Sequence, residues 1–278
     1  MRKRLLVIAF LIASLSLGSQ NPGLVPVGQS GDWTLLFSDD FDGQSLDVSR
    51  WTTCYWWQGH WITDGCTNEA TGELQWYQPD NVLISDGTLR IRAQEQTVLT
   101  VDVDGEEETY HYTSGIITSG REVSDISTPA RFAFQYGYVE MRAKIPRGRG
   151  LWPAFWLLPA DHNSTPEIDV MEIHGHESNM VRMYLHHFED SVGSDWNGPD
   201  FSADWHTFAL DWQPEAIVWY VDGVERWRYT VAGDIPATPM YLLVNLAVGG
   251  ESPGGPDAST MFPSYYEIDY VRAWQRSP

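Results

Sequence analysis

Apolar and polar residues alternate along much of the chain after residue 32. The clearest case runs from Tyr138 to Ile145, where apolar residues at 139, 141, 143 and 145 are separated by polar ones. A period of two residues is that of a β-strand with one face packed and the other in solvent. We therefore expect a half-buried strand in this segment.

Two Asp-Gly pairs predict tight hairpins. Asp86-Gly87 follows the apolar run 82–84, and Asp222-Gly223 follows the run 217–221. Asp-Gly favours two-residue turns that join antiparallel strands. No window of a dozen residues keeps the i, i+3, i+4 apolar spacing of a helix, and Pro or Gly interrupts most candidates. The pattern indicates an almost all-β fold.

The length suits one large all-β domain, residues 20–278, although two small domains would also fit. An antiparallel domain of about 250 residues has to close its edges or stack two sheets. We expect a concanavalin-like β-jelly-roll sandwich of two curved antiparallel sheets with one concave face. Lectins share this architecture, so the fold alone does not decide the function.

The segment 166–175 carries three carboxylates, and its β-branched residues favour a strand. Glu167 and Asp169 then share a face, whereas strict alternation sends Glu172 to the other face. A one-residue β-bulge between Asp169 and Glu172 restores the parity and places all three acids together. Two carboxyl groups about 5–5.5 Å apart are typical of retaining glycoside hydrolysis. The alternative is a solvated acidic face, which mutual repulsion makes costly.

Composition and charge narrow the possible partners. Lys+Arg is 17 and Asp+Glu is 38, which gives a formal net charge of −21. This charge repels phosphate backbones and anionic membrane surfaces, so we expect neither nucleic acid nor membrane as a partner. The chain also has 14 Trp, and several lie among polar residues, for example Trp56, Trp57, Trp61 and Trp196. They are either packing residues or part of a sugar-stacking groove.

The N-terminus predicts export. Residues 1–19 combine the basic Arg2–Arg4, an apolar run from Leu5 to Leu17 and small residues after it, as in a secretory signal peptide. The run is shorter than the ~20 residues that span a bilayer. We therefore expect a secreted, extracellular protein.

Longer motifs identify a resemblance. The segments Tyr136–Pro146 and Gly148–Pro159, followed by Glu167–Glu172, resemble glycoside hydrolase family 16. The resemblance is to its laminarinase-like branch, whose motif contains the extra residue that a bulge requires. It extends from about Phe37 to Arg272 and includes Glu73–Tyr77, Tyr112–Gly115 and Leu243–Gly250.

The resemblance implies roles for individual positions. Glu167 is the nucleophile, Asp169 its assisting carboxylate and Glu172 the general acid/base. The resemblance also places Trp152, Trp156, Asn245 and His187 in the cleft. His187 and Phe188 together match a His-aromatic pair of the family, although His186 competes with His187 for that place. The implied activity is that of a monomeric, endo-acting, retaining hydrolase of 1,3- or 1,3-1,4-β-glucan, with no cofactor required for the chemistry. Departures at Gly72, Tyr138 and 250–254 leave the exact glycan open.

Many relatives bind a structural calcium ion on the convex side, and the matching positions are Asp40, Gly87 and Asp269. Oxygen ligands suit calcium. Without the resemblance, Asp40 and Asp269 would be interpreted as turn and surface residues, and Gly87 as a hairpin glycine.

Other functions stay open at this point. A non-catalytic glucan-binding module would be marked by loss of either glutamate, and both are present. A zinc site at His174-x-His176 with Glu177 lacks a further ligand at suggestive spacing, and histidines in a loop after a strand are commoner. Within the enzyme class the substrate could be a galactan, an agarose-type polymer or a bacterial exopolysaccharide. A transglycosylase would pass through the same glycosyl-enzyme.

Cys54 and Cys66 are the two cysteines of the chain, and export favours a disulfide between them. Closing this loop should stabilise the fold by roughly 2–3 kcal/mol. We expect a non-reduced digest of the exported protein to contain the linked peptides, and reduction to lower the melting temperature more than the activity. Two free thiols in that digest would contradict the pairing.

Overall fold

The computed structural model describes residues 24–55, 66–101, 106–121, 128–161, 163–187 and 190–277. The expected leader, Trp56, Trp57, Trp61 and Phe188 lie outside these ranges. Strands dominate the described residues, where the helices are the short 3-10 turns η1 (Glu69–Thr71), η2 (Pro79–Asn81) and η3 (Gly175–Glu177). None of these helices has the length and apolar character needed to cross a membrane. The expectation of an almost all-β chain is confirmed.

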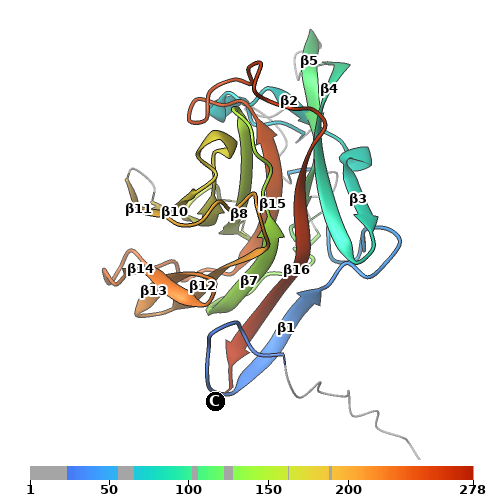
Figure 1. The fold of residues 1–278 in the computed structure, drawn as a ribbon. Helices are drawn as coiled ribbons and strands as arrows, with labels where there is room; N and C mark the ends of the chain where they lie inside the picture. The colour runs from blue at the N-terminus through green and yellow to red at the C-terminus, as the bar shows by residue number, and fades with distance from the viewer. Residues whose placement is uncertain are drawn as a thin grey trace, which may run out of the picture.

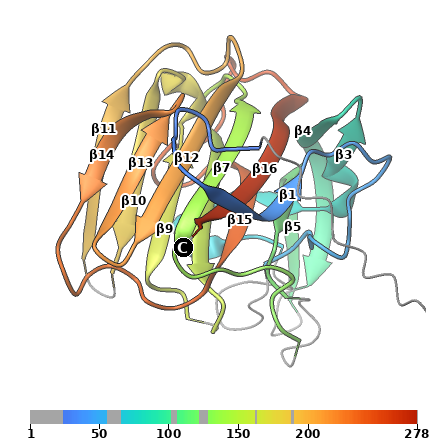
Figure 2. The same cartoon turned by 90° about the horizontal axis from the view of Figure 1, so that it is seen from below.

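Two sheets stack face to face (Figures 1 and 2). In the described residues the larger sheet has ten strands, and its main path is β14 (Val224–Tyr229), β13 (Ala216–Val221), β12 (His206–Gln213), β7 (Gly137–Lys144), β16 (Ser264–Arg276), β4 (Thr88–Val101), β5 (Glu107–Ser114) and β2 (Gln75–Tyr77). Beside this path, β1 (Trp33–Asp39) pairs with β16, and β3 (Val82–Ser85) pairs with β4.

The smaller sheet has six strands among the described residues. Their order is β11 (Ser191–Asn197), β10 (Met180–His186), β9 (Glu167–Glu172), β8 (Leu151–Pro159), β15 (Met240–Val248) and β6 (Ile116–Thr118). Pairing is antiparallel in both sheets except between β2 and β5, which run parallel. The predicted jelly-roll sandwich of two antiparallel sheets is confirmed.

The main hydrophobic core fills the space between the sheets. Val139 and Met141 of β7 contribute to it from one side, and Ile168 and Met171 of β9 from the other. Burying one such side chain stabilises the fold by about 1.5–3 kcal/mol. The core therefore fixes which face of each strand points outward.

The expected alternation on β7 is only half right. Val139, Met141 and Ala143 enter the core as predicted, but Tyr138 and Glu140 on the other face are also buried. The segment that precedes β1 covers them, and the backbone N–H of Val27 donates to Glu140 Oε2 at 3.0 Å. The prediction that the outer face of β7 is solvated was wrong, because a segment distant in the sequence lies over that face.

Both predicted hairpins form. Asp86-Gly87 joins β3 to β4, and Asp222-Gly223 joins β13 to β14, with positive φ at all four residues. Positive φ at both central positions is the requirement of the two-residue turn that Asp-Gly favours.

Cys54 and Cys66 come together as expected, with their Sγ atoms 2.6 Å apart. The residues between them include 56–65, which lie outside the described ranges. The disulfide itself stays a prediction.

Candidate active site

The bulge predicted in the carboxylate strand is present in β9. Asp169 pairs with Trp156 of β8, but the next β8 residue, Phe155, pairs with Met171, which leaves Val170 as the extra residue. Pairing with β10 shows the same shift, since Tyr184 faces Asp169 and Arg182 faces Glu172. Val170 and Met171 both enter the core, whereas a regular strand would send one of them outward.

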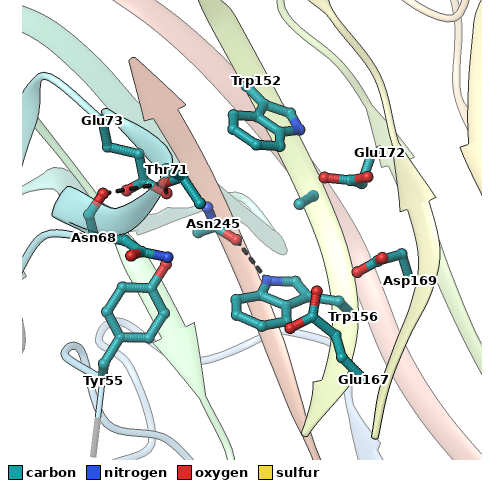
Figure 3. Close-up of a pocket in the computed structure, with 11 residues that line it drawn as sticks. Tyr55, Asn68, Thr71, Glu73, Trp152, Trp156, Glu167, Asp169, Glu172 and Asn245 are labelled. Carbon is teal, nitrogen blue, oxygen red and sulfur yellow. Dashed lines mark hydrogen bonds between the residues drawn. The ribbon is translucent and has the colours of Figure 1, made fainter. Parts of the chain in front are cut away.

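As a result, Glu167, Asp169 and Glu172 line one pocket on the outer face of the smaller sheet (Figure 3). Trp152 and Trp156 reach it from β8, and Asn245 reaches it from β15. The remaining lining residues are Tyr55, Asn68, Thr71, Glu73 and Ala154. The structure thus brings together the three predicted acids, both tryptophans and Asn245.

Burial is the main electrostatic influence on the three acids. It raises the pKa of Glu172 to about 8 and the pKa of Asp169 to about 7. Burial, and then the charge of Asp169, also raise the pKa of Glu167 well above its usual range, although 28% of that side chain is exposed at the pocket. The acids cannot all ionise in so little water, so they share protons as one coupled group.

The histidine beside these acids is His186, which corrects the assignment of His187. Strand β10 pairs His186 with Glu167, and its Nε2 lies 2.8 Å from Asp169 Oδ2. Its Nδ1 lies 2.6 Å from Ser191 Oγ, which holds the ring in place. His187 follows the strand and has the opposite parity, so its ring lies near Tyr229 of β14 instead. Alternation along β10 decides between the two.

A chain of hydrogen bonds holds Trp156. Its indole N–H donates to Asn245 Oδ1 at 2.8 Å, and Asn245 Nδ2 donates to the hydroxyl of Tyr77 at 2.9 Å. Tyr77 in turn donates to Glu73 Oε2 at 3.1 Å. Asn245 is therefore a support for Trp156 as well as a lining residue.

Glu73 is a fourth acid of the pocket, and the sequence analysis did not single it out as a site residue. Burial raises its pKa to about 7. Thr71 Oγ1 donates to its other oxygen, Oε1, at 3.2 Å. An acidic residue just before the segment Leu74-Gln75-Trp76-Tyr77, with its two aromatic residues, was the available signal.

Trp152 lies next to Glu172 (Figure 3). Burial raises the pKa of Glu172, and the buried indole N–H of Trp152 partly opposes this by favouring the ionised carboxylate. Its ring meets the edge of His174 at 6.0 Å. Trp152 is therefore placed to influence the protonation of Glu172.

The cluster considered for zinc does form, at η3. Ligand atoms of His174, His176 and Glu177 lie within 4.8 Å of one another. However, the Arg182 guanidinium binds the Glu177 carboxylate, and Ser252 Oγ lies 3.0 Å from His174 Nε2. An ion would have to displace that arginine, so the ion pair and hydrogen bonds explain the cluster without a metal.

The residues considered for calcium are engaged elsewhere. Asp40 Oδ1 accepts two hydrogen bonds from Arg272, at 2.9 and 2.6 Å, and Asp269 Oδ2 accepts one from Arg142 at 2.6 Å. Gly87 lies in the β3–β4 hairpin. One oxygen of each carboxylate is thus held by a guanidinium group, and calcium stays an untested prediction.

Comparisons with known proteins identify the family of this chain. The family model of glycosyl hydrolases family 16 matches residues 75–272. The endo-1,3-1,4-beta-glycanase EglC of Rhizobium meliloti (strain 1021) is 37% identical over 257 residues, which are 87% of this chain and 51% of that protein. This chain therefore spans about half the length of EglC.

Two further relatives match over most of their own length. A beta-glucanase of Rhodothermus marinus is 31% identical over an alignment 305 residues long, gaps included, which covers 99% of this chain and 95% of that protein. The crystal structure of the laminarinase catalytic domain from Thermotoga maritima MSB8 superposes with a TM-score of 0.74 at 32% identity, covering 89% of this chain and 100% of that one.

The raised pKa of Glu172 predicts a cost in stability. A carboxyl with a raised pKa in the folded state favours folding at pH values below its unfolded pKa, and this contribution is lost as pH rises through about 8. Glu172→Gln should therefore be more stable than the wild type at pH 9, by roughly 1–3 kcal/mol. At pH 4 the two should be nearly equal.

Urea unfolding at both pH values measures the difference. Glu251→Gln, at an exposed acid, serves as the control, and its stability should stay close to that of the wild type at both pH values. If the wild type were more stable than Glu172→Gln at pH 9, burial would not be the cause of the raised pKa of Glu172.

Proposed function

The chain belongs to glycosyl hydrolases family 16, and we propose that it hydrolyses internal linkages of a 1,3- or 1,3-1,4-β-glucan with retention of anomeric configuration. The observation that carries the proposal is the bulge in β9, which sets Glu167, Asp169 and Glu172 on one face beside two tryptophans. The names of the relatives support the substrate class.

Glu172 is the proposed general acid/base. Its raised pKa, about 8, keeps it protonated at neutral pH, as the first step requires. It donates its proton to the glycosidic oxygen while Glu167 attacks the anomeric carbon and the bond to the leaving sugar breaks. In the second step Glu172 removes a proton from the water that attacks the glycosyl-enzyme, and the bond to Glu167 breaks.

Glu167 must be ionised when it attacks. In the free protein its pKa is raised, but the charge of His186 opposes this. The developing positive charge of an oxocarbenium-like transition state favours the anion further. Asp169 assists because it lies between the two glutamates and shares a proton with Glu167.

The shape of the site supports endo action on a polymer. The pocket lies over β8, β9 and β15, in the middle of the smaller sheet, with further strands on both sides. Aromatic faces such as those of Trp152 and Trp156 suit sugar rings. A chain of sugars could therefore continue past the site in either direction.

The chemistry proposed here needs no cofactor, and export through the N-terminal leader remains part of the proposal. Reducing-sugar release from laminarin, lichenan, agarose and galactan would identify the substrate among the alternatives. Longer products formed at high oligosaccharide concentration would indicate transglycosylation. Binding to laminarin without any release would indicate a non-catalytic module.

The assigned roles predict the stereochemical outcome. Glu167→Ala and Glu172→Ala should each lower activity by at least about 10³-fold, while the fold stays intact. Azide should rescue Glu167→Ala and give a glycosyl azide of inverted configuration, because it attacks from the vacated side. For the wild type, proton NMR should show the β-anomer as the first reducing end. An initial α-anomer would refute the role of Glu167.

The electrostatics predict the pH profile. Hydrolysis should decline above pH about 8, where Glu172 loses its proton, and should also decline at low pH, where Glu167 is protonated. His186 lowers the pKa of both glutamates, so His186→Gln should move both limbs to higher pH. The profile of kcat/KM measures this shift, and His111→Gln, at an exposed histidine of β5, is the control. Identical profiles for the wild type and His186→Gln would exclude this influence.

A further inference from the structure

The bulge of β9 is held from the opposite sheet. The indole N–H of Trp219, on β13 of the larger sheet, donates to the backbone carbonyl of Asp169 at 2.7 Å. Trp219 is fully buried in the core between the sheets. This is a hydrogen bond across the hydrophobic interior to the central residue of the candidate catalytic strand.

The bulge explains why the carbonyl points that way. An extra residue disrupts the strand ladder and reorients the peptide units next to it. Because a donor on the other sheet reaches the Asp169 oxygen, that carbonyl is directed into the core, while its carboxylate faces the pocket. Without Trp219 the carbonyl would lose this partner where no water is at hand, a costly state for a buried polar group.

Trp219 is itself held rigidly. Its ring stacks on Trp227 of β14 with centroids 4.2 Å apart and planes 26° apart. Its neighbours in β13 pair regularly with β12, an inner strand of the larger sheet. The donor is therefore a fixed point against which the peptide of Asp169 is set.

We propose that Trp219 is a positioning residue that fixes the bulge of β9 and thereby the relative placement of Glu167 and Glu172. This rests on the proposed function for its kinetic consequence. Without the bond, the peptide after Asp169 can reorient within the bulge, which changes the placement of the Glu172 carboxyl relative to that of Glu167. Trp219 touches no substrate and acts only through the backbone of Asp169.

The test compares two Trp→Phe substitutions. Trp219→Phe removes the donor and keeps an aromatic ring in the core. Trp212→Phe is the matched control, because Trp212 is equally buried, lies on neighbouring β12, and donates its indole N–H to a backbone carbonyl, that of Pro236, at 3.0 Å. Both variants lose one buried hydrogen bond, but only one of these bonds ends at the bulge.

With laminarin or lichenan, whichever the wild type cleaves, Trp219→Phe should lower kcat about 10- to 100-fold and change KM less than about twofold. Trp212→Phe should keep kcat within about twofold of the wild-type value, although its melting temperature should fall by about as much as that of Trp219→Phe. An equal loss of kcat in both variants, or an unchanged kcat in Trp219→Phe, would overturn the proposal.

A second measurement needs no activity. Carboxyl ¹³C NMR titration should show the coupled transitions of Glu167, Asp169 and Glu172 displaced in Trp219→Phe and unmoved in Trp212→Phe. If the wild type cleaves no glucan, the proposed function fails, but this titration still decides the role of Trp219. If Trp219→Phe does not fold, the indole proton of Trp219 in the wild type decides: a downfield NMR shift like that of the bonded indole of Trp212 supports the bond, and the shift of an unbonded indole excludes it.

Discussion

One extra residue in β9, fixed between two regular neighbours, is the constraint on which the site depends. Strands β8 and β10 pair with β9 on both sides of the bulge, so the extra residue cannot be absorbed by a slip in register. Slipping would expose Ile168 and Met171, which lie in the core. The cost of exposing them maintains the bulge, and the bulge in turn places three acids on one face.

This placement is unfavourable for the folded protein by itself. Glu73, Glu167, Asp169 and Glu172 all line one pocket, and burial raises the pKa of each. Burial of the large apolar core behind β9 offsets this cost. In the proposed mechanism, the same raised pKa that weakens folding at high pH provides the proton donor at neutral pH. Stability and chemistry therefore oppose each other at these residues.

The supporting contacts of the site come from segments that are distant in the sequence. Trp156 is held through Asn245 and Tyr77, which belong to β15 and β2. His186 lies between Asp169 and Ser191, which belong to the strands on either side of β10. Trp156 and His186 are thus each oriented by neighbouring strands, which is how a rigid scaffold positions the side chains of a site.

The sequence by itself determined what depends on neighbours along the chain. Period-two alternation, two Asp-Gly turns and the spacing of Glu167, Asp169 and Glu172 were sufficient for an all-β fold and for the bulge, because backbone parity is a local property. They did not determine which histidine faces the acids, that Tyr138 and Glu140 are covered, or that Glu73 joins the pocket. The tertiary structure decided these points, since each depends on which distant strand or segment packs there. The bond from Trp219 to Asp169 belongs to the same class, because it joins two sheets whose contact no local pattern encodes.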